Sequence, residues 1–148
     1  MPFCYNGGTA RAEGIGEILT SIPFYKLYFV IVKEGEKQST GAMYNLLDSK
    51  TQNRSADITP MITAFNEGNP EKIAGSVYNA FELCWDMEKM LSVFDGFAPS
   101  ARLLSGSGPA VVALFKDSVT AKKCCDELQK RGINAYFAES VSCGSVIE

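Results

Sequence analysis

A short run of small residues is the part of this chain best suited to bind an anion. It consists of Ser105, Gly106, Ser107 and Gly108, and Pro109 follows it. Glycine lets a backbone turn sharply and point its N–H groups outward, and such a concave turn binds phosphate-like anions. Neither a helix nor a Gly-Lys-Ser/Thr motif follows the glycines, so the run is neither a dinucleotide fingerprint nor a P-loop. An ordinary strand-to-strand turn is the alternative interpretation.

The rest of the composition limits which kinds of catalytic site and metal site the chain can form. The sequence contains no histidine, which excludes the usual serine and cysteine triads and removes the commonest general base. The five cysteines form no C-x-x-C pair, so neither a disulfide framework nor a structural zinc site is predicted. Chemistry here must therefore use carboxylates, lysine, hydroxyls or backbone amides. The net charge of −3 is spread without a basic stripe, which argues against binding nucleic acid.

Strands are predicted on both sides of the serine–glycine turn, at 101–104 and 110–115. The run at 27–32 is apolar on both faces and therefore predicts a central strand. A last strand is expected over 133–138. Residues 2–21 predict short strands that glycine turns join.

Helices are predicted in the connections. Ser39 or Thr40 would cap the first helix and Asp57 the second, and Pro70 suits the first position of a third. Ser118 would cap the last helix. A long helix is expected to begin near Asn79 and to carry one apolar face, formed by Phe81, Cys84, Met87, Leu91 and Phe94. Tyr44 and Trp85 fit helical stripes that are typical of a core.

The order of these elements predicts an α+β fold in one domain of 148 residues. From residue 25 onward it is strand, helices, strand, strand, helix, strand, which is the split βαβ or ferredoxin-like arrangement with extra helices. Helical crossovers over one sheet predict a two-layer sandwich. Residues 1–24 would form a separate hairpin segment, and residues 25–148 the domain itself.

The chain is expected to be cytoplasmic and not bound to a membrane. Its longest apolar run, residues 27–32, is far too short to cross a bilayer. No signal peptide precedes the first residues, Met1, Pro2 and Phe3.

Several motifs together with the turn resemble the GHMP kinases. In chain order they are Gly7-Gly8-Thr9-Ala10, Gly14-Ile15-Gly16-Glu17, Ser39-Thr40 with Tyr44, Asn79-Ala80-Phe81-Glu82, and the run from Arg102 to Gly108. The similarity covers essentially the whole chain and is greatest to the branch of 4-diphosphocytidyl-2-C-methyl-D-erythritol kinases. Ile15 departs from the arginine that the family often has there, which weakens a phosphate contact by this hairpin.

The resemblance implies that this chain is the C-terminal, substrate-side domain of an ATP-dependent kinase. The kinase would phosphorylate the 2-hydroxyl of 4-diphosphocytidyl-2-C-methyl-D-erythritol in non-mevalonate isoprenoid synthesis, using ATP and Mg2+. Thr40 would lie at the substrate, and the turn, Ser105, Gly106, Ser107 and Gly108, would support the phosphate site. The family's catalytic aspartate would stand directly before Met1, so no catalytic residue and no metal ligand is expected within the chain.

Asn79 has two interpretations, as a helix boundary and as an amide that hydrogen-bonds the turn. Glu17 would organise its hairpin or lie on the surface, and Arg102 would face an anionic substrate or solvent.

Two further functions remain open. The chain would belong to another GHMP kinase, of the homoserine or mevalonate type, or would be a stand-alone ferredoxin-like module that binds a small ligand or dimerises. In the kinase interpretation an N-terminal GHMP domain is the missing partner, and the isolated chain would be inactive. The face that this partner covers would be apolar, so the fragment is expected either to form a homodimer or to order residues 1–21 poorly.

Overall fold

The central sheet has four antiparallel strands in the order β4-β5-β3-β6. The computed structural model describes residues 3, 7–33, 35–36, 39–51 and 56–144. The strands are β3 (Tyr28–Lys33), β4 (Ala101–Leu104), β5 (Ala110–Phe115) and β6 (Ala135–Glu139). β3 pairs with both β5 and β6, so the apolar run does form a central strand. This strand order is the ferredoxin-like one, and the predicted α+β class is confirmed.

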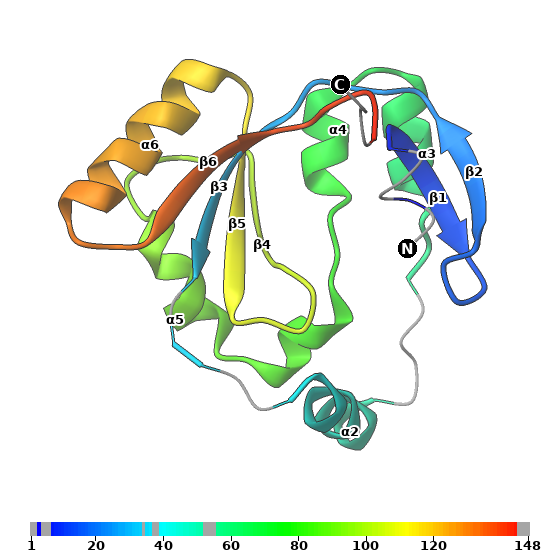
Figure 1. The fold of residues 1–148 in the computed structure, drawn as a ribbon, viewed down its shortest axis with the longest axis horizontal. Coiled ribbons are helices and arrows are strands. Elements are labelled where there is room, and N and C mark those ends of the chain that lie inside the picture. The colour runs from blue at the N-terminus through cyan, green and yellow to red at the C-terminus, as the bar shows by residue number, and fades with distance from the viewer. Residues whose placement is uncertain (1–2, 4–6, 34, 37–38, 52–55, 145–148) are drawn as a thin grey trace.

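Helices lie on both faces of this sheet (Figure 1). α6 (Ser118–Lys130) packs on one face, and α3 (Thr59–Asn66) and α4 (Pro70–Gly75) lie on the other. Alternation along β5 divides the side chains, because Ala113 joins the core under α6 whereas Leu114 joins the core under α3 and α4. The extra helices of the first crossover therefore add cover to the second face of the sandwich.

One of the predicted helix caps is confirmed. Ser39 is the N-cap of α2 (Thr40–Lys50), and its Oγ accepts a hydrogen bond from the Ala42 N–H at 3.2 Å. For α3 the prediction was wrong, because Ile58, rather than Asp57, is the N-cap, although Asp57 accepts the Thr59 N–H at 2.9 Å. For α6 the prediction was wrong, because Asp117, rather than Ser118, is the N-cap.

The long helix predicted after Asn79 does not form. The chain instead makes a 3-10 helix η1 (Ala80–Cys84), the short helix α5 (Met87–Leu91) and a second 3-10 helix η2 (Ser92–Phe94). Trp85 is extended between η1 and α5, and Asp86 caps α5 by accepting the Lys89 N–H at 3.2 Å. A cap and a tertiary contact of Trp85 thus override the helical spacing of the apolar residues.

The N-terminal strands pair with each other in a separate two-stranded sheet. β1 (Thr9–Glu13) and β2 (Ile18–Ile22) form an antiparallel hairpin, as the glycine turns predicted. Glu17 organises the turn, because its Oε2 accepts the Ile15 N–H at 2.6 Å. In the ribbon the hairpin lies beside α3, away from the main sheet (Figure 1). Residues 4–6 of the predicted segment lie outside the described residues.

Cysteines in α6 serve as core residues. Cys124 is fully buried under the sheet, and burial raises the pKa of its thiol to about 11. A thiol with such a pKa stays protonated and inert. Of the helices in the described ranges, none has the length and apolar character needed to cross a membrane.

The burial pattern of α6 predicts the effect of two matched truncations. Leu128 is fully buried, so Leu128→Ala should lower the free energy of unfolding by about 3 kcal/mol, through lost apolar contacts and a cavity. Val119 lies on the same helix but is 76% exposed, and Val119→Ala should change it by no more than about 0.5 kcal/mol. Urea unfolding of both variants measures the difference; equal losses would contradict this packing of α6.

Candidate functional site

The serine–glycine turn joins β4 to β5 and closes on itself through two backbone hydrogen bonds. The Ser105 N–H donates to the Ala110 carbonyl at 2.8 Å, and the Gly108 N–H donates to the Ser105 carbonyl at 3.0 Å. Gly106 and Gly108 have φ of +54° and +80°, a region that other residues adopt at a cost. The glycines are thus needed for the shape of the turn.

Asn79 connects this turn to the helical crossover. Its Nδ2 donates to the carbonyls of Leu104 and Gly106, each at 2.8 Å, and its Oδ1 accepts the Phe81 N–H at 3.0 Å. Both interpretations of Asn79 are therefore confirmed, because one amide starts η1 and hydrogen-bonds the turn. An amide carries two N–H donors and an acceptor together, whereas a hydroxyl has a single donor and an ionised carboxylate has none.

Two more side chains of the same segment bond the turn, and sequence reasoning assigned neither of them this role. Glu82 accepts the Leu104 N–H at 2.9 Å, and Trp85 Nε1 donates to the Ser107 carbonyl at 3.3 Å. The Trp85 ring also lies against Gly108, where an added Cβ would come within 2.7 Å of it. Residues 79–85, called the clamp segment below, thus hold both the start and the far side of the turn. The one signal was the Asn-x-x-Glu spacing of Asn79 and Glu82.

One N–H of the turn is available to a ligand. Gly106 is exposed, and no acceptor for its N–H exists within the described part of the chain. Ser107 is 8% exposed and lies in the buried part of the turn. The arrangement suits an anion that approaches at Gly106.

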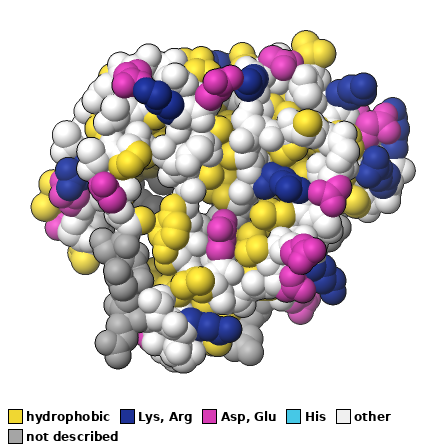
Figure 2. Space-filling model, turned by 180° about the vertical axis from the view of Figure 1, so that it is seen from behind, with side chains coloured by type: hydrophobic (Ala, Val, Ile, Leu, Met, Phe, Trp, Pro, Cys, Tyr) yellow, Lys and Arg dark blue, Asp and Glu magenta, His cyan; other side chains and the backbone are white. Residues whose placement is uncertain are grey.

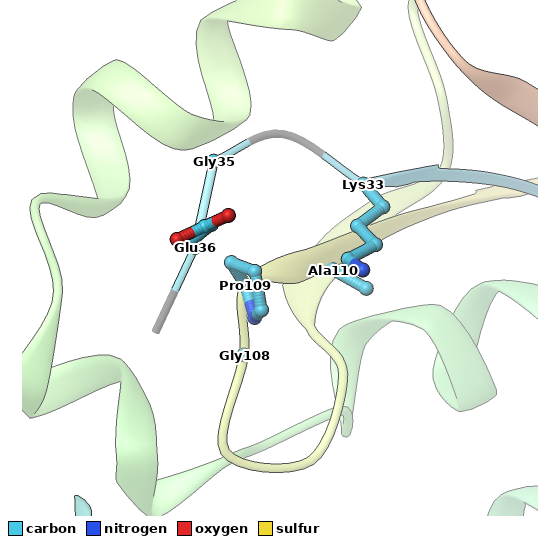
Figure 3. Close-up of a pocket in the computed structure, with 6 residues that line it drawn as sticks. All are labelled: Lys33, Gly35, Glu36, Gly108, Pro109 and Ala110. Carbon is cyan, nitrogen blue, oxygen red and sulfur yellow. The ribbon is translucent and has the colours of Figure 1, made fainter. Parts of the chain in front are cut away.

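Hollows lie on both sides of the turn. An apolar groove of about 400 Å³ starts at Ser105 and Gly106 and runs along the sheet face under α3. On the other side a cavity of about 470 Å³ borders Gly108 and Pro109. Figure 3 shows Lys33 extending from the end of β3 past Ala110, with Glu36 across from it beyond Pro109. A cation therefore lies near the turn on this side.

Helix α2 reaches the turn through the clamp segment. Thr40 is the exposed first residue of α2, and the neighbouring Ser39 caps the helix. Tyr44 is 46% exposed, so its placement in the core was wrong, and its ring meets Phe81 edge-on at 4.9 Å between centroids. Helix α2 therefore contacts the clamp segment through the half-exposed ring of Tyr44.

The charged groups around this region do not form a metal site or a basic surface. No group of three or more His, Cys, Asp or Glu residues in the described ranges is placed to hold a metal ion. Arg102 pairs with Asp95 at 2.8 Å and donates to the Leu91 carbonyl at 3.1 Å, so it braces α5 and η2 against β4. Figure 2 shows both signs of charge scattered over the rear face.

The contact between Gly108 and Trp85 predicts unequal effects of two glycine substitutions. Gly108→Ala should lower the free energy of unfolding by about 2 to 4 kcal/mol, since the methyl group meets the indole ring and φ is positive. Gly106→Ala has open space and should cost only about 1 kcal/mol, from φ alone. Urea unfolding compares them, and equal losses would show that the ring does not fill the space beside Gly108.

Known proteins resemble this chain in sequence and in fold. Residues 61–134 match the family "GHMP kinases C terminal". A 4-diphosphocytidyl-2-C-methyl-D-erythritol kinase of Clostridium botulinum is 31% identical over 147 residues, which are 95% of this chain and 52% of that protein. The chain thus spans about half the length of the curated relatives it matches.

Among solved structures, homoserine kinase from Cytophaga hutchinsonii has a TM-score of 0.71 at 15% identity, covering 97% of this chain and 51% of that one. A 4-(cytidine 5'-diphospho)-2C-methyl-D-erythritol kinase has a TM-score of 0.64 at 19% identity, covering 88% of this chain and 48% of that one. These likenesses show the fold alone. Because the matched family covers half of its 148 residues, the chain belongs to the GHMP kinases as their C-terminal domain.

Proposed function

We propose that this chain is the C-terminal, substrate-side half of an ATP-dependent kinase that phosphorylates the 2-hydroxyl of 4-diphosphocytidyl-2-C-methyl-D-erythritol, in non-mevalonate isoprenoid synthesis. The observation that carries the proposal is the 31% identity, over nearly the whole chain, to proteins of that name. The homoserine kinase likeness, at 15% identity, carries no argument about the substrate.

The serine–glycine turn would support the phosphates of ATP. Phosphoryl transfer depends mainly on positioning and on stabilising charge, for which fixed backbone N–H groups are suited. Gly106 offers an exposed N–H, while Ser105 and Gly108 spend theirs on holding the turn. Bound ATP would supply the phosphoryl group, and these residues would hold and orient its anionic end.

Thr40 would contribute on the side of the alcohol. It stands at the start of α2, and the helix does not depend on it for capping, because Ser39 serves that purpose. No group of three or more acidic, cysteine or histidine ligands is present among the described residues. The ligands for Mg2+ and the catalytic aspartate would belong to the N-terminal half of the longer protein.

A direct assay tests the proposed reaction. The longer protein that contains this sequence should transfer phosphate from ATP to 4-diphosphocytidyl-2-C-methyl-D-erythritol, and not to homoserine or mevalonate. The 148-residue chain alone should show no turnover, because positioning by both halves is required. Product formation is measured by phosphorus NMR with each alcohol. Preferred turnover of another alcohol would contradict the proposed substrate. Turnover by the 148-residue chain alone would contradict the proposal that both halves are required.

The apolar groove beside the turn supports a partner in the N-terminal half. Its walls come from the sheet and from α3, including Phe29, Met61, Phe65 and Leu103, and Tyr78 at its edge is 54% exposed. An exposed apolar surface of this kind favours association. The N-terminal half would cover it in the longer protein, and residues 1–24, with their separate hairpin, would join that half. In the isolated chain a second copy would cover it.

Sedimentation of the isolated chain tests this partner surface. The 148-residue chain should form a homodimer at micromolar concentration, and Tyr78→Ser should weaken that dimer because it makes the groove edge polar. Tyr136→Ser is the matched control, since Tyr136 is similarly exposed, at 60%, but lies on β6 away from the groove. A chain that stays monomeric, or a dimer that only the control weakens, would contradict the proposal.

A further inference from the structure

The clamp segment, residues 79–85, places three side chains on four backbone groups of the turn. Asn79 donates to the Leu104 and Gly106 carbonyls, Glu82 accepts the Leu104 N–H, and Trp85 donates to the Ser107 carbonyl. We infer that Asn79, Glu82 and Trp85 are positioning residues, which hold the turn so that the exposed Gly106 N–H points at the phosphates of ATP. This inference rests on the proposed kinase function, and it adds residues that act through the turn.

The direction of the peptide groups supports this assignment. In a trans peptide the carbonyl and the following N–H point to opposite sides. Asn79 holds the Gly106 carbonyl, so the Ser107 N–H must point away from the clamp segment. The Ser105 carbonyl is held by the Gly108 N–H inside the turn, so the Gly106 N–H must point out of it. The clamp segment thus holds carbonyls of the turn on one side, while the exposed Gly106 N–H points outward, where an anion would bind.

The backbone N–H of Leu104 needs an acceptor, which the carboxylate of Glu82 in the clamp segment provides. β4 is an edge strand, and the Leu104 N–H and carbonyl both point away from β5, to the open side. An edge strand with unpaired groups is free to shift or to pair elsewhere. Glu82 and Asn79 satisfy both groups, and a hydrogen bond to a charged acceptor is stronger than a neutral one. The turn therefore starts from a fixed residue, and the Glu82 charge lies on the side away from the outward N–H groups.

The same segment holds α2. The edge-on contact between Tyr44 and Phe81 ties α2 to η1, and η1 follows directly from Asn79. A change in Asn79 alters the turn without removing this aromatic contact. Loss of the clamp should therefore weaken binding of the nucleotide more than binding of the alcohol.

Asn79→Ser in the longer protein tests the inference. Serine can still cap η1 but is too short to reach both carbonyls. We expect the dissociation constant for a non-hydrolysable ATP analogue, measured by calorimetry, to rise about tenfold, the equivalent of roughly one lost hydrogen bond. Amide hydrogen exchange at residues 104–108 should accelerate, while the KM of the alcohol changes less than about twofold. Asn69→Ser is the matched control, because Asn69 caps α4 with the same kind of bond, away from the turn.

Three further variants test the inference if Asn79→Ser unfolds the protein. Trp85→Phe removes the donor to the Ser107 carbonyl, together with the indole atoms nearest Gly108, and keeps an aromatic ring in the clamp segment. Glu82→Ala should weaken nucleotide binding, and Glu82→Gln, which keeps an acceptor, should recover most of that loss. Unchanged nucleotide affinity in the folded Asn79→Ser and Trp85→Phe proteins would overturn the positioning role. A wild-type protein that binds no nucleotide would overturn the proposed function itself, which separates the two failures.

Discussion

The hydrogen bonds from the Asn79 amide to the Leu104 and Gly106 carbonyls are the constraint on which the rest of the site depends. Together with the bond that the same amide accepts from the Phe81 N–H, they join a strand edge, a glycine turn and the start of a 3-10 helix through one side chain. Without them the turn would be held by its own two backbone hydrogen bonds and by Trp85 on its far side. With these hydrogen bonds the peptide groups of the turn are held in a fixed orientation. An anion site with fixed peptide groups binds its ligand without rearranging.

The first crossover of the fold, between β3 and β4, holds extra elements that bring these groups together. A ferredoxin-like sheet needs only one helix between β3 and β4, yet this chain places α2, α3, α4 and the clamp segment there. α3 and α4 cover the second face of the sheet, which frees the intervening chain to pass the open edge of β4. The clamp segment is the part of the chain that passes this edge. Structure that looks like an insertion in the sandwich is therefore what positions the site.

The chemistry that the chain can perform is limited by its side chains as much as by its fold. It has no histidine, and its described residues gather no acidic cluster for a metal. Around the turn it offers backbone N–H groups, hydroxyls and Lys33, and the carboxylate of Glu36 lines the same cavity. The chain belongs to the GHMP kinases and spans about half the length of its relatives, which agrees with this limited set of functional groups.

The sequence by itself determined the elements whose signals are local. Apolar runs placed all four strands of the sheet, and Ser39 and Pro70 marked helix starts, because periodicity and capping act within a few residues. Only the tertiary structure decided the break at Trp85, the exposure of Tyr44, and the bond from Glu82 to Leu104. Trp85 and Glu82 each bond a residue 22 positions away, and spacing along the chain carries no record of such a partner.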